Sequence, residues 1–216
     1  MNFSRFKGII FDLDGTLISS ESVWNDIDYR FLKKRGYDVP EDYCKIVSAM
    51  NFHQAAVYTN ERFKLNENLN DIEQEWADMA RDEYADSIPE KPGARDFLIR
   101  LKEKNIKIAL ATASSEFLYK PALERLGMYE YFDFFAVTDN VKRGKGFPDI
   151  YEYACRGLSL ETEDCAVFED IIEAVRGAKA GGFYTVACMD RIHKKDCEQL
   201  KAESDFYFYD YNLLEV

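Results

Sequence analysis

The sequence predicts an α/β protein: a Rossmann-like, mainly parallel sheet with helices on both faces, and an all-helical cap domain inserted into it. Two observations lead to this fold class. Short β-rich runs alternate with helical patterns along most of the chain, which is typical of βαβ units. One long stretch, residues 18–88, shows only helical patterns and falls between the first β-rich run and the second. We therefore expect a core domain of residues 1–17 and 89–216, and a cap domain of residues 18–88.

Six β-rich runs define the expected strands of the core. Each is rich in apolar, β-branched or aromatic residues and is bounded by polar or turn-forming residues. They are residues 8–12, 107–112, 133–139, 165–170, 184–188 and 205–209. Helical patterns follow at 92–104, 116–126, 149–158 and 171–180, with Gly127 and Gly181 as expected helix ends. Strands and helices in this order predict a sheet that is covered on both faces.

The inserted stretch predicts packed amphipathic helices. Two stripes of apolar residues recur at helical spacing, namely Val23, Trp24, Ile27 and Phe31, and then Leu69, Ile72, Trp76, Met79, Ala80 and Tyr84. Aromatic residues at this spacing ordinarily form a core, so we prefer that interpretation to a cofactor site. The chain returns to the core through the segment "SIPEKPGA", in which two prolines and a glycine interrupt the helical pattern.

Composition excludes several classes of protein. The 216 residues carry a formal net charge of -12, which argues against a surface that binds nucleic acid. The longest apolar run, "IALATA", is too short to cross a membrane, and the N-terminus shows no signal-peptide pattern. The five cysteines form no CxxC pair, which is typical of reduced thiols. We expect a cytoplasmic monomer without nucleic-acid or membrane partners.

Polar residues stand at four of the expected strand ends. They are Asp12 and Asp14 after the first strand, Thr112 and Ala113 after the second, Lys145 in a basic loop after the third, and Glu169 and Asp170 after the fourth. Each has an ordinary explanation as a turn, a helix cap or a solvated charge. Ligands of open α/β sheets bind at the carboxyl ends of the strands, so four such groups together favour one shared site.

These residue types suit phosphoryl transfer with Mg²⁺. Oxygen ligands from Asp12 and Asp170, a backbone carbonyl near Asp14 and water would complete an octahedral site. Asp12, kept ionised beside the metal, would attack phosphorus. Asp14 would give a proton to the leaving alkoxide and later take one from water.

The remaining groups suit the phosphate itself. Thr112 and nearby backbone N–H groups, including that of Ala113, would hold phosphoryl oxygens, and Lys145 would neutralise their charge. Gly15 would let the backbone approach the phosphate closely. The expected partner is a small phosphorylated metabolite.

Four segments, "DLDGTL", "LATAS", "GKGFPD" and "FEDIIEAVRGAKAGG", resemble in order and spacing the motifs of the haloacid dehalogenase superfamily. Within it, the whole chain resembles the branch of β-phosphoglucomutase and phosphoglycolate phosphatase. The resemblance implies an aspartyl-phosphate intermediate on Asp12 and acid/base work by Asp14. It also implies Mg²⁺ held by Asp12, Asp14 and Asp170, with support from Glu169. The sequence departs from the family pattern at Ser19, Gly146, Ile171 and Ala174, and none of these departures removes a catalytic group.

The leading hypothesis is a Mg²⁺-dependent phosphatase of small phosphate monoesters. One alternative is a hexose phosphomutase similar to β-phosphoglucomutase, and another is a non-catalytic protein that binds phosphorylated metabolites. A dehalogenase needs no metal, and a phosphonatase needs a cap lysine that no local pattern selects. Candidate specificity residues of the cap are Ser20, Trp24, Met50 and His53.

The mutase alternative stays open at this point. Mutases of this branch carry a histidine soon after the first motif, and "ISSESVWND" has none. They also carry an arginine in a glycine-containing cap loop, and "SAMNFHQAAV" lacks both residues. After the second motif, Ser115 and Glu116 replace the Lys-Asn of the mutases. His53 and Lys120 are the nearby residues that would have to substitute.

Overall fold

The computed structural model describes residues 1–48, 50–189 and 197–216. Its centre is one six-stranded sheet with the strand order β3-β2-β1-β4-β5-β6. The strands are β1 (Gly8–Phe11), β2 (Lys107–Thr112), β3 (Phe134–Val137), β4 (Cys165–Glu169), β5 (Tyr184–Cys188) and β6 (Phe206–Phe208). All neighbouring strands pair in parallel, which confirms the Rossmann-like prediction and sharpens "mainly parallel" to parallel for every described strand.

The strand order places a switch point at the centre of the sheet. The chain builds one half of the sheet with β1, β2 and β3, and then returns to place β4 on the other side of β1. Ligands of open α/β sheets bind at such a point, outside the carboxyl ends of the strands. The end of β1 is therefore where the fold favours a site.

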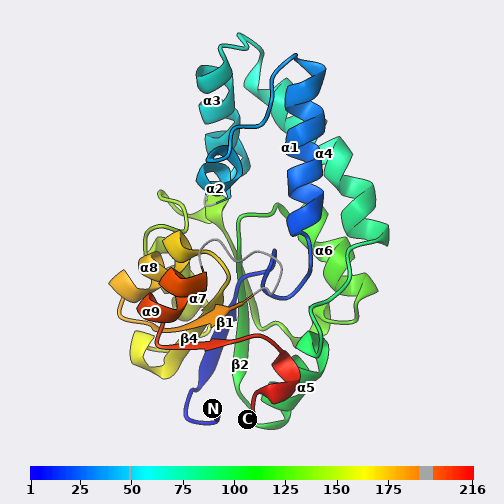
Figure 1. Cartoon of the computed structure of the whole chain (residues 1–216). Coiled ribbons are helices and arrows are strands. Elements are labelled where there is room, and N and C mark those ends of the chain that lie inside the picture. The colour runs from blue at the N-terminus through cyan, green and yellow to red at the C-terminus, as the bar shows by residue number, and fades with distance from the viewer. Residues whose placement is uncertain (49, 190–196) are drawn as a thin grey trace.

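Helices cover both faces of the sheet, as predicted. The core helices are α5 (Ala94–Glu103), α6 (Glu116–Arg125), α7 (Asp149–Gly157), α8 (Ile172–Ala180) and α9 (Cys197–Glu203). Figure 1 shows α7, α8 and α9 on one side of the sheet, and α5 and α6 on the other. Side chains alternate along a strand, so Ile9 and Phe11 of β1 pack on the side of α5, while Ile10 packs on the side of α7. Burial on both faces explains why the strand is apolar throughout.

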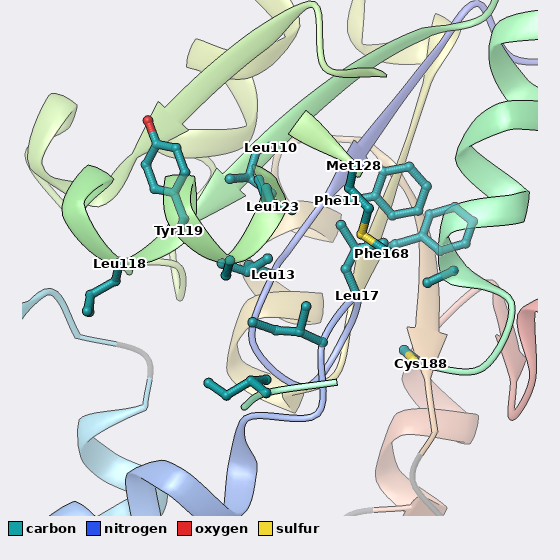
Figure 2. Packing of buried hydrophobic residues seen from close by; sticks show 14 of the residues in the cluster. Phe11, Leu13, Leu17, Leu110, Leu118, Tyr119, Leu123, Met128, Phe168 and Cys188 are labelled. Atoms are coloured by element: carbon teal, nitrogen blue, oxygen red, sulfur yellow. The ribbon is translucent and has the colours of Figure 1, made fainter. Parts of the chain in front are cut away.

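The core continues beyond the end of β1. The rings of Phe11 and Phe168, from neighbouring strands, have centroids 4.7 Å apart. Figure 2 shows them in the same cluster as Leu13 and Leu17, which follow the strand and are fully buried. These apolar residues hold the segment that also carries Asp12 and Asp14.

The predicted helical cap is confirmed. The helices α1 (Glu21–Lys34), α2 (Tyr43–Val47), α3 (Phe52–Phe63) and α4 (Leu69–Asp86) lie between β1 and α5 in the chain and beyond one end of the sheet in space (Figure 1). The two predicted stripes pack together, with the rings of Phe31 and Trp76 5.2 Å apart. None of the described helices is long and apolar enough to span a membrane.

Two linkers join the cap to the core and are bonded to each other. The Ser19 N–H donates to the Pro89 carbonyl at 2.9 Å, and the Lys91 N–H donates to the Leu17 carbonyl at 2.8 Å. The linkers are residues 12–20, between β1 and α1, and residues 87–93, between α4 and α5; the predicted division into domains at residues 17/18 and 88/89 stays a prediction. Paired linkers of this kind would act together when the cap moves relative to the core.

Candidate active site

A cavity of about 310 Å³ lies between the strand ends and the cap. Its core wall brings together residues from separate strand ends, namely Asp12, Asp14, Ala113, Ser114, Lys145, Glu169 and Asp170. Its cap wall includes Ser20, Trp24 and Met50. The cavity is at the small end of the range for metabolite sites, which suits a compact ligand.

Lys145 joins two carboxylates at the core wall. Its Nζ donates to Glu169 Oε1 at 2.8 Å and to Asp12 Oδ1, and all three side chains are buried. Burial lowers the pKa of Lys145, but the charges of Asp12 and Glu169 outweigh it and leave the pKa above its ordinary value. Tyr151, which sequence reasoning did not single out, also donates to Glu169 Oε1 at 2.8 Å.

The loop that carries Lys145 is fixed from below by α8. A Cβ atom added at Gly177 would overlap with the backbone carbonyl of Lys145, so only glycine allows this close approach. On the outside of the same loop, Arg143 pairs with Asp149 at 2.6 Å. Contacts with Gly177 and between Arg143 and Asp149 thus fix the loop that carries the ammonium group of Lys145.

Three acidic side chains form a cluster that fits a hard cation. Asp12, Glu169 and Asp170 each offer a carboxylate oxygen, and these atoms lie within 4.8 Å of one another. Asp12 Oδ2 and Glu169 Oε2 are buried and have no hydrogen-bond partner among the described residues. Buried carboxylate oxygens without partners are costly, and a divalent cation with oxygen ligands would satisfy them.

The protonation of these acids agrees with this interpretation. Burial raises the pKa of Asp12 above its ordinary value and the pKa of Glu169 to about 8, although Lys145 opposes both shifts. A cation at the cluster would favour the ionised forms again. Glu169 is therefore as much a part of the cluster as Asp12 and Asp170, whereas the family resemblance implied only a supporting role for it.

Asp14 occupies a different environment from Asp12. Its Oδ1 accepts hydrogen bonds from the Ser20 hydroxyl, at 2.6 Å, and from the Tyr84 hydroxyl, while its Oδ2 accepts from the Ser114 hydroxyl at 2.6 Å. The carboxylate is not part of the acidic cluster of Asp12, Glu169 and Asp170, and metal binding by Asp14 stays a prediction. The role of its backbone carbonyl stays a prediction.

The hydroxyl groups around Asp14 connect it to the cap. Ser20 follows the first linker, and Tyr84 belongs to α4 and is fully buried. The Tyr84 hydroxyl in turn accepts a hydrogen bond from Trp24 Nε1 at 2.7 Å. Asp14 thus lies where the core meets the cap, and a chain of two hydrogen bonds runs from it to a residue of the cap wall.

Two predicted phosphate-binding residues have structural duties. Thr112 is fully buried, and its Oγ1 accepts the Ser114 N–H at 2.9 Å, while Ala113 and Ser114 line the cavity beside it. Gly15 has a positive φ of 86°, and a Cβ atom there would overlap with the carboxylate of Asp170. Room for the carboxylate of Asp170 is thus one reason for a glycine at this position. Phosphate binding by Thr112 and Gly15 stays a prediction.

The four candidate specificity residues divide into two groups. Ser20, Trp24 and Met50 line the cavity. His53 is not among the lining residues; it lies on the outer side of α3, where its Nδ1 is 2.9 Å from a carboxylate oxygen of Glu73 and its side chain is 63% exposed. Its neighbour Phe52 lines the cavity, so the two residues lie on different sides of α3.

Comparison with known proteins identifies the family. A family model described as haloacid dehalogenase-like hydrolase matches residues 6–182. The chain is 28% identical over 176 residues to a phosphorylated carbohydrates phosphatase of Thermotoga maritima, covering 82% of each protein. It is 27% identical over 211 residues to the validoxylamine A 7'-phosphate phosphatase of Streptomyces hygroscopicus, covering 95% of this chain and 94% of that protein.

A solved structure supports the same fold. The β-phosphoglucomutase of Clostridium difficile superimposes with a TM-score of 0.82 at 20% identity, covering 96% of this chain and 92% of that one. At this identity the likeness concerns the fold alone, including a sheet and cap of the kind described above. Together with the match over most of the chain, it leads to one conclusion: the protein belongs to the haloacid dehalogenase-like hydrolase family.

Proposed function

We propose that this hydrolase is a Mg²⁺-dependent phosphatase that acts on small phosphate monoesters through an aspartyl-phosphate intermediate on Asp12. One observation carries the proposal. The buried Asp12 carboxylate is bound on one oxygen by Lys145, and its other oxygen has no partner among the described residues at the wall of a cavity. The relatives named as phosphatases of phosphorylated compounds support the reaction type.

Asp12 is suited to be the nucleophile. Lys145 favours the ionised form of Asp12, so the carboxylate oxygen that the cation does not hold can form a bond to phosphorus while the ester P–O bond breaks. Asp12, Glu169 and Asp170 would hold Mg²⁺, which when bound would neutralise phosphoryl charge near the carboxylate. Lys145 adds a second positive charge beside the transferred group.

Asp14 is suited to the proton transfers. Protonated, it would donate to the alkoxide oxygen that leaves phosphorus; ionised, it would accept a proton from the water that attacks the aspartyl phosphate. Both carboxylate oxygens of Asp14 accept hydrogen bonds from hydroxyl groups in this structure. The substrate must therefore replace at least one of these hydrogen bonds. This replacement would couple proton transfer by Asp14 to its contacts with the cap.

The cap side of the cavity favours hydrolysis over mutase chemistry. A mutase must bind a second phosphate in the cap, which requires cationic side chains there. His53 faces Glu73 on the surface, and Lys120 lies 3.8 Å from Glu116 and is not among the lining residues. The cap wall instead contains the carboxylate of Asp28, which would repel a phosphate.

The test combines two substrates. Purified protein is incubated with p-nitrophenyl phosphate and Mg²⁺, with and without excess EDTA, and phosphate release is followed. We expect release that chelation abolishes and added Mg²⁺ restores; no release from folded protein would favour a binding protein. In the second arm, fast conversion of β-glucose 1-phosphate to glucose 6-phosphate with catalytic glucose 1,6-bisphosphate, and little free phosphate, would support the mutase instead.

A further inference from the structure

The cap end of the cavity is largely apolar. Its wall contains Trp24, Ile27, Val47, Phe52 and Trp76. The ring of Phe52 lies edge-on to those of Trp24 and Trp76, with centroids 5.6 Å and 6.1 Å apart. Such a surface buries an apolar ring well and offers few partners to the hydroxyl groups of a polyol.

Several polar side chains in this part of the wall already have partners within the cap. The Tyr43 hydroxyl lies 2.7 Å from that of Thr59, and Asn51 Oδ1 accepts the Gln54 N–H at 2.8 Å to cap α3. These groups are thus committed to holding the cap helices together. They leave Asp28 as the charged side chain of the cap wall.

Asp28 is a buried acid in a largely apolar environment. It is 8% exposed, lines the cavity, and accepts a hydrogen bond from the Cys44 thiol at 3.3 Å. A thiol is a weak donor, and among the described residues no lysine, arginine or histidine pairs with Asp28. Burial raises the pKa of Asp28 to about 6, so the side chain is mainly ionised at pH 7 and above.

A buried carboxylate without a cation is unfavourable unless something supplies the missing charge. Asp28 and Trp24 lie one turn apart on α1, so both face the same side of the helix. The opposite end of the cavity holds Lys145 and the acidic cluster, where the phosphate would bind. A ligand that spans the cavity therefore meets a phosphate site, an aromatic wall and then a carboxylate.

We propose that the substrate of this site is a phosphate monoester whose alcohol part carries a compact apolar ring and, beyond it, a protonated amine that pairs with Asp28. This inference rests on the proposed function and names the chemical class of its substrate. Asp28 is then the specificity-determining residue of the cap. The amine gains a charged hydrogen bond, and the carboxylate gains the cation that the protein does not provide.

The test measures binding without turnover. The Asp12→Asn variant is titrated in Mg²⁺ by calorimetry with three esters: para-(aminomethyl)benzyl phosphate, para-ethylbenzyl phosphate, which has the same shape without the charge, and sorbitol phosphate. We expect the amine to bind at least about tenfold more tightly than the ethyl ester, and both to bind more tightly than sorbitol phosphate. Adding Asp28→Asn should reduce the preference for the amine to within about threefold.

A matched control is available on the same helix. Asp26 is exposed and pairs with Arg30, so Asp26→Asn removes the same charge outside the cavity and should leave the preference unchanged. Circular dichroism checks that each variant is folded. If Asp28→Asn does not fold, the preference of the Asp12→Asn protein for the amine ester over the ethyl ester still tests the inference.

Three results would overturn the inference: equal binding of the amine and ethyl esters, a preference that survives Asp28→Asn, or tighter binding of sorbitol phosphate. Failure of the proposed function shows itself differently, as the absence of phosphate release from every ester by the unaltered protein.

Discussion

The two ends of the cavity differ in how they are built. The core end consists of charged groups from separate strand ends, and Lys145 ties Asp12 to Glu169 there. The cap end consists of aromatic and aliphatic side chains from helices, with Asp28 as an acid that has no cation among the described residues. The parallel sheet brings the charged groups together through its topology, whereas the apolar wall of the cap results from the packing of its own helices.

Asp14 is where the two ends meet. Its carboxylate accepts hydrogen bonds from the hydroxyl groups of Ser20 and Tyr84 on the cap side and of Ser114 on the core side. We propose that the core end performs the chemistry and that the cap end recognises the substrate. Variants at Asp14, Asp28 and Tyr84 should then affect different properties of the protein.

Among these three residues, the largest effect is expected at Asp14. Asp14→Asn keeps the hydrogen-bonded position but removes the proton donor and base, so turnover should fall by roughly a hundredfold or more. Asp12 is unchanged, so the phosphorylated protein should accumulate, and rapid-quench mass spectrometry would detect it. Turnover close to that of the unaltered protein would mean that another group moves the proton, and the distinction between the two aspartates would be lost.

The next effect concerns stability and Asp28. Its pKa is raised by burial from 3.8 to about 6, so the stability that the protonated group contributes is present below pH 3.8 and is lost as pH rises through about 6. Asp28→Asn does not lose this stability. Its free energy of unfolding, relative to that of the unaltered protein, should therefore rise by about 2 to 3 kcal/mol between pH 4 and pH 7. Cys44 and Tyr43, which face Asp28, have pKa values raised by burial and stay uncharged in this range.

Denaturant titration at both pH values measures this difference. Asp26→Asn, exposed on the same helix, should show no comparable trend with pH. A gain that is the same at pH 4 and pH 7 would show that Asp28 is not held ionised in an apolar environment, and the contrast between the two ends would weaken.

The smallest of these effects is expected at Tyr84. Tyr84→Phe removes the hydroxyl that donates to Asp14 and accepts from Trp24, so we expect turnover to fall by about tenfold with a smaller change in KM. Tyr37→Phe is the control, because its hydroxyl binds a backbone carbonyl elsewhere in the cap. A change in KM alone would assign Tyr84 to substrate binding instead of the positioning of Asp14.

The core end could be predicted because its signals are local. Apolar runs mark the strands, and Asp12, Lys145 and Asp170 stand at or shortly after their ends, so parallel pairing brings them together. The need for room beside Gly15 for the carboxylate of Asp170 could not be predicted, because the two residues are far apart in the chain. A contact between residues so far apart in the chain cannot be predicted from a local sequence pattern.

The cap end was less predictable for the same reason. Asp28 resembles any charged residue of an amphipathic helix, and only its spacing of one turn from Trp24 could have indicated that it faces inward. Tyr84 was recognised as part of an apolar stripe, but its contact with Asp14 depends on how α4 packs against the core. His53 was expected near the substrate because it lies close to Met50 in sequence, and the turn of α3 directs it outward.

The central claim is that Asp12 is the nucleophile at the core end, and its phosphorylation tests this most directly. Protein with Mg²⁺ and p-nitrophenyl phosphate is quenched in acid during turnover, digested and analysed by mass spectrometry, with Asp14→Asn used to prolong the intermediate. We predict one added phosphoryl group on the peptide that contains Asp12, and none in Asp12→Asn, which should release no phosphate. A phosphoryl group on another residue, or undiminished phosphate release by Asp12→Asn, would contradict the mechanism.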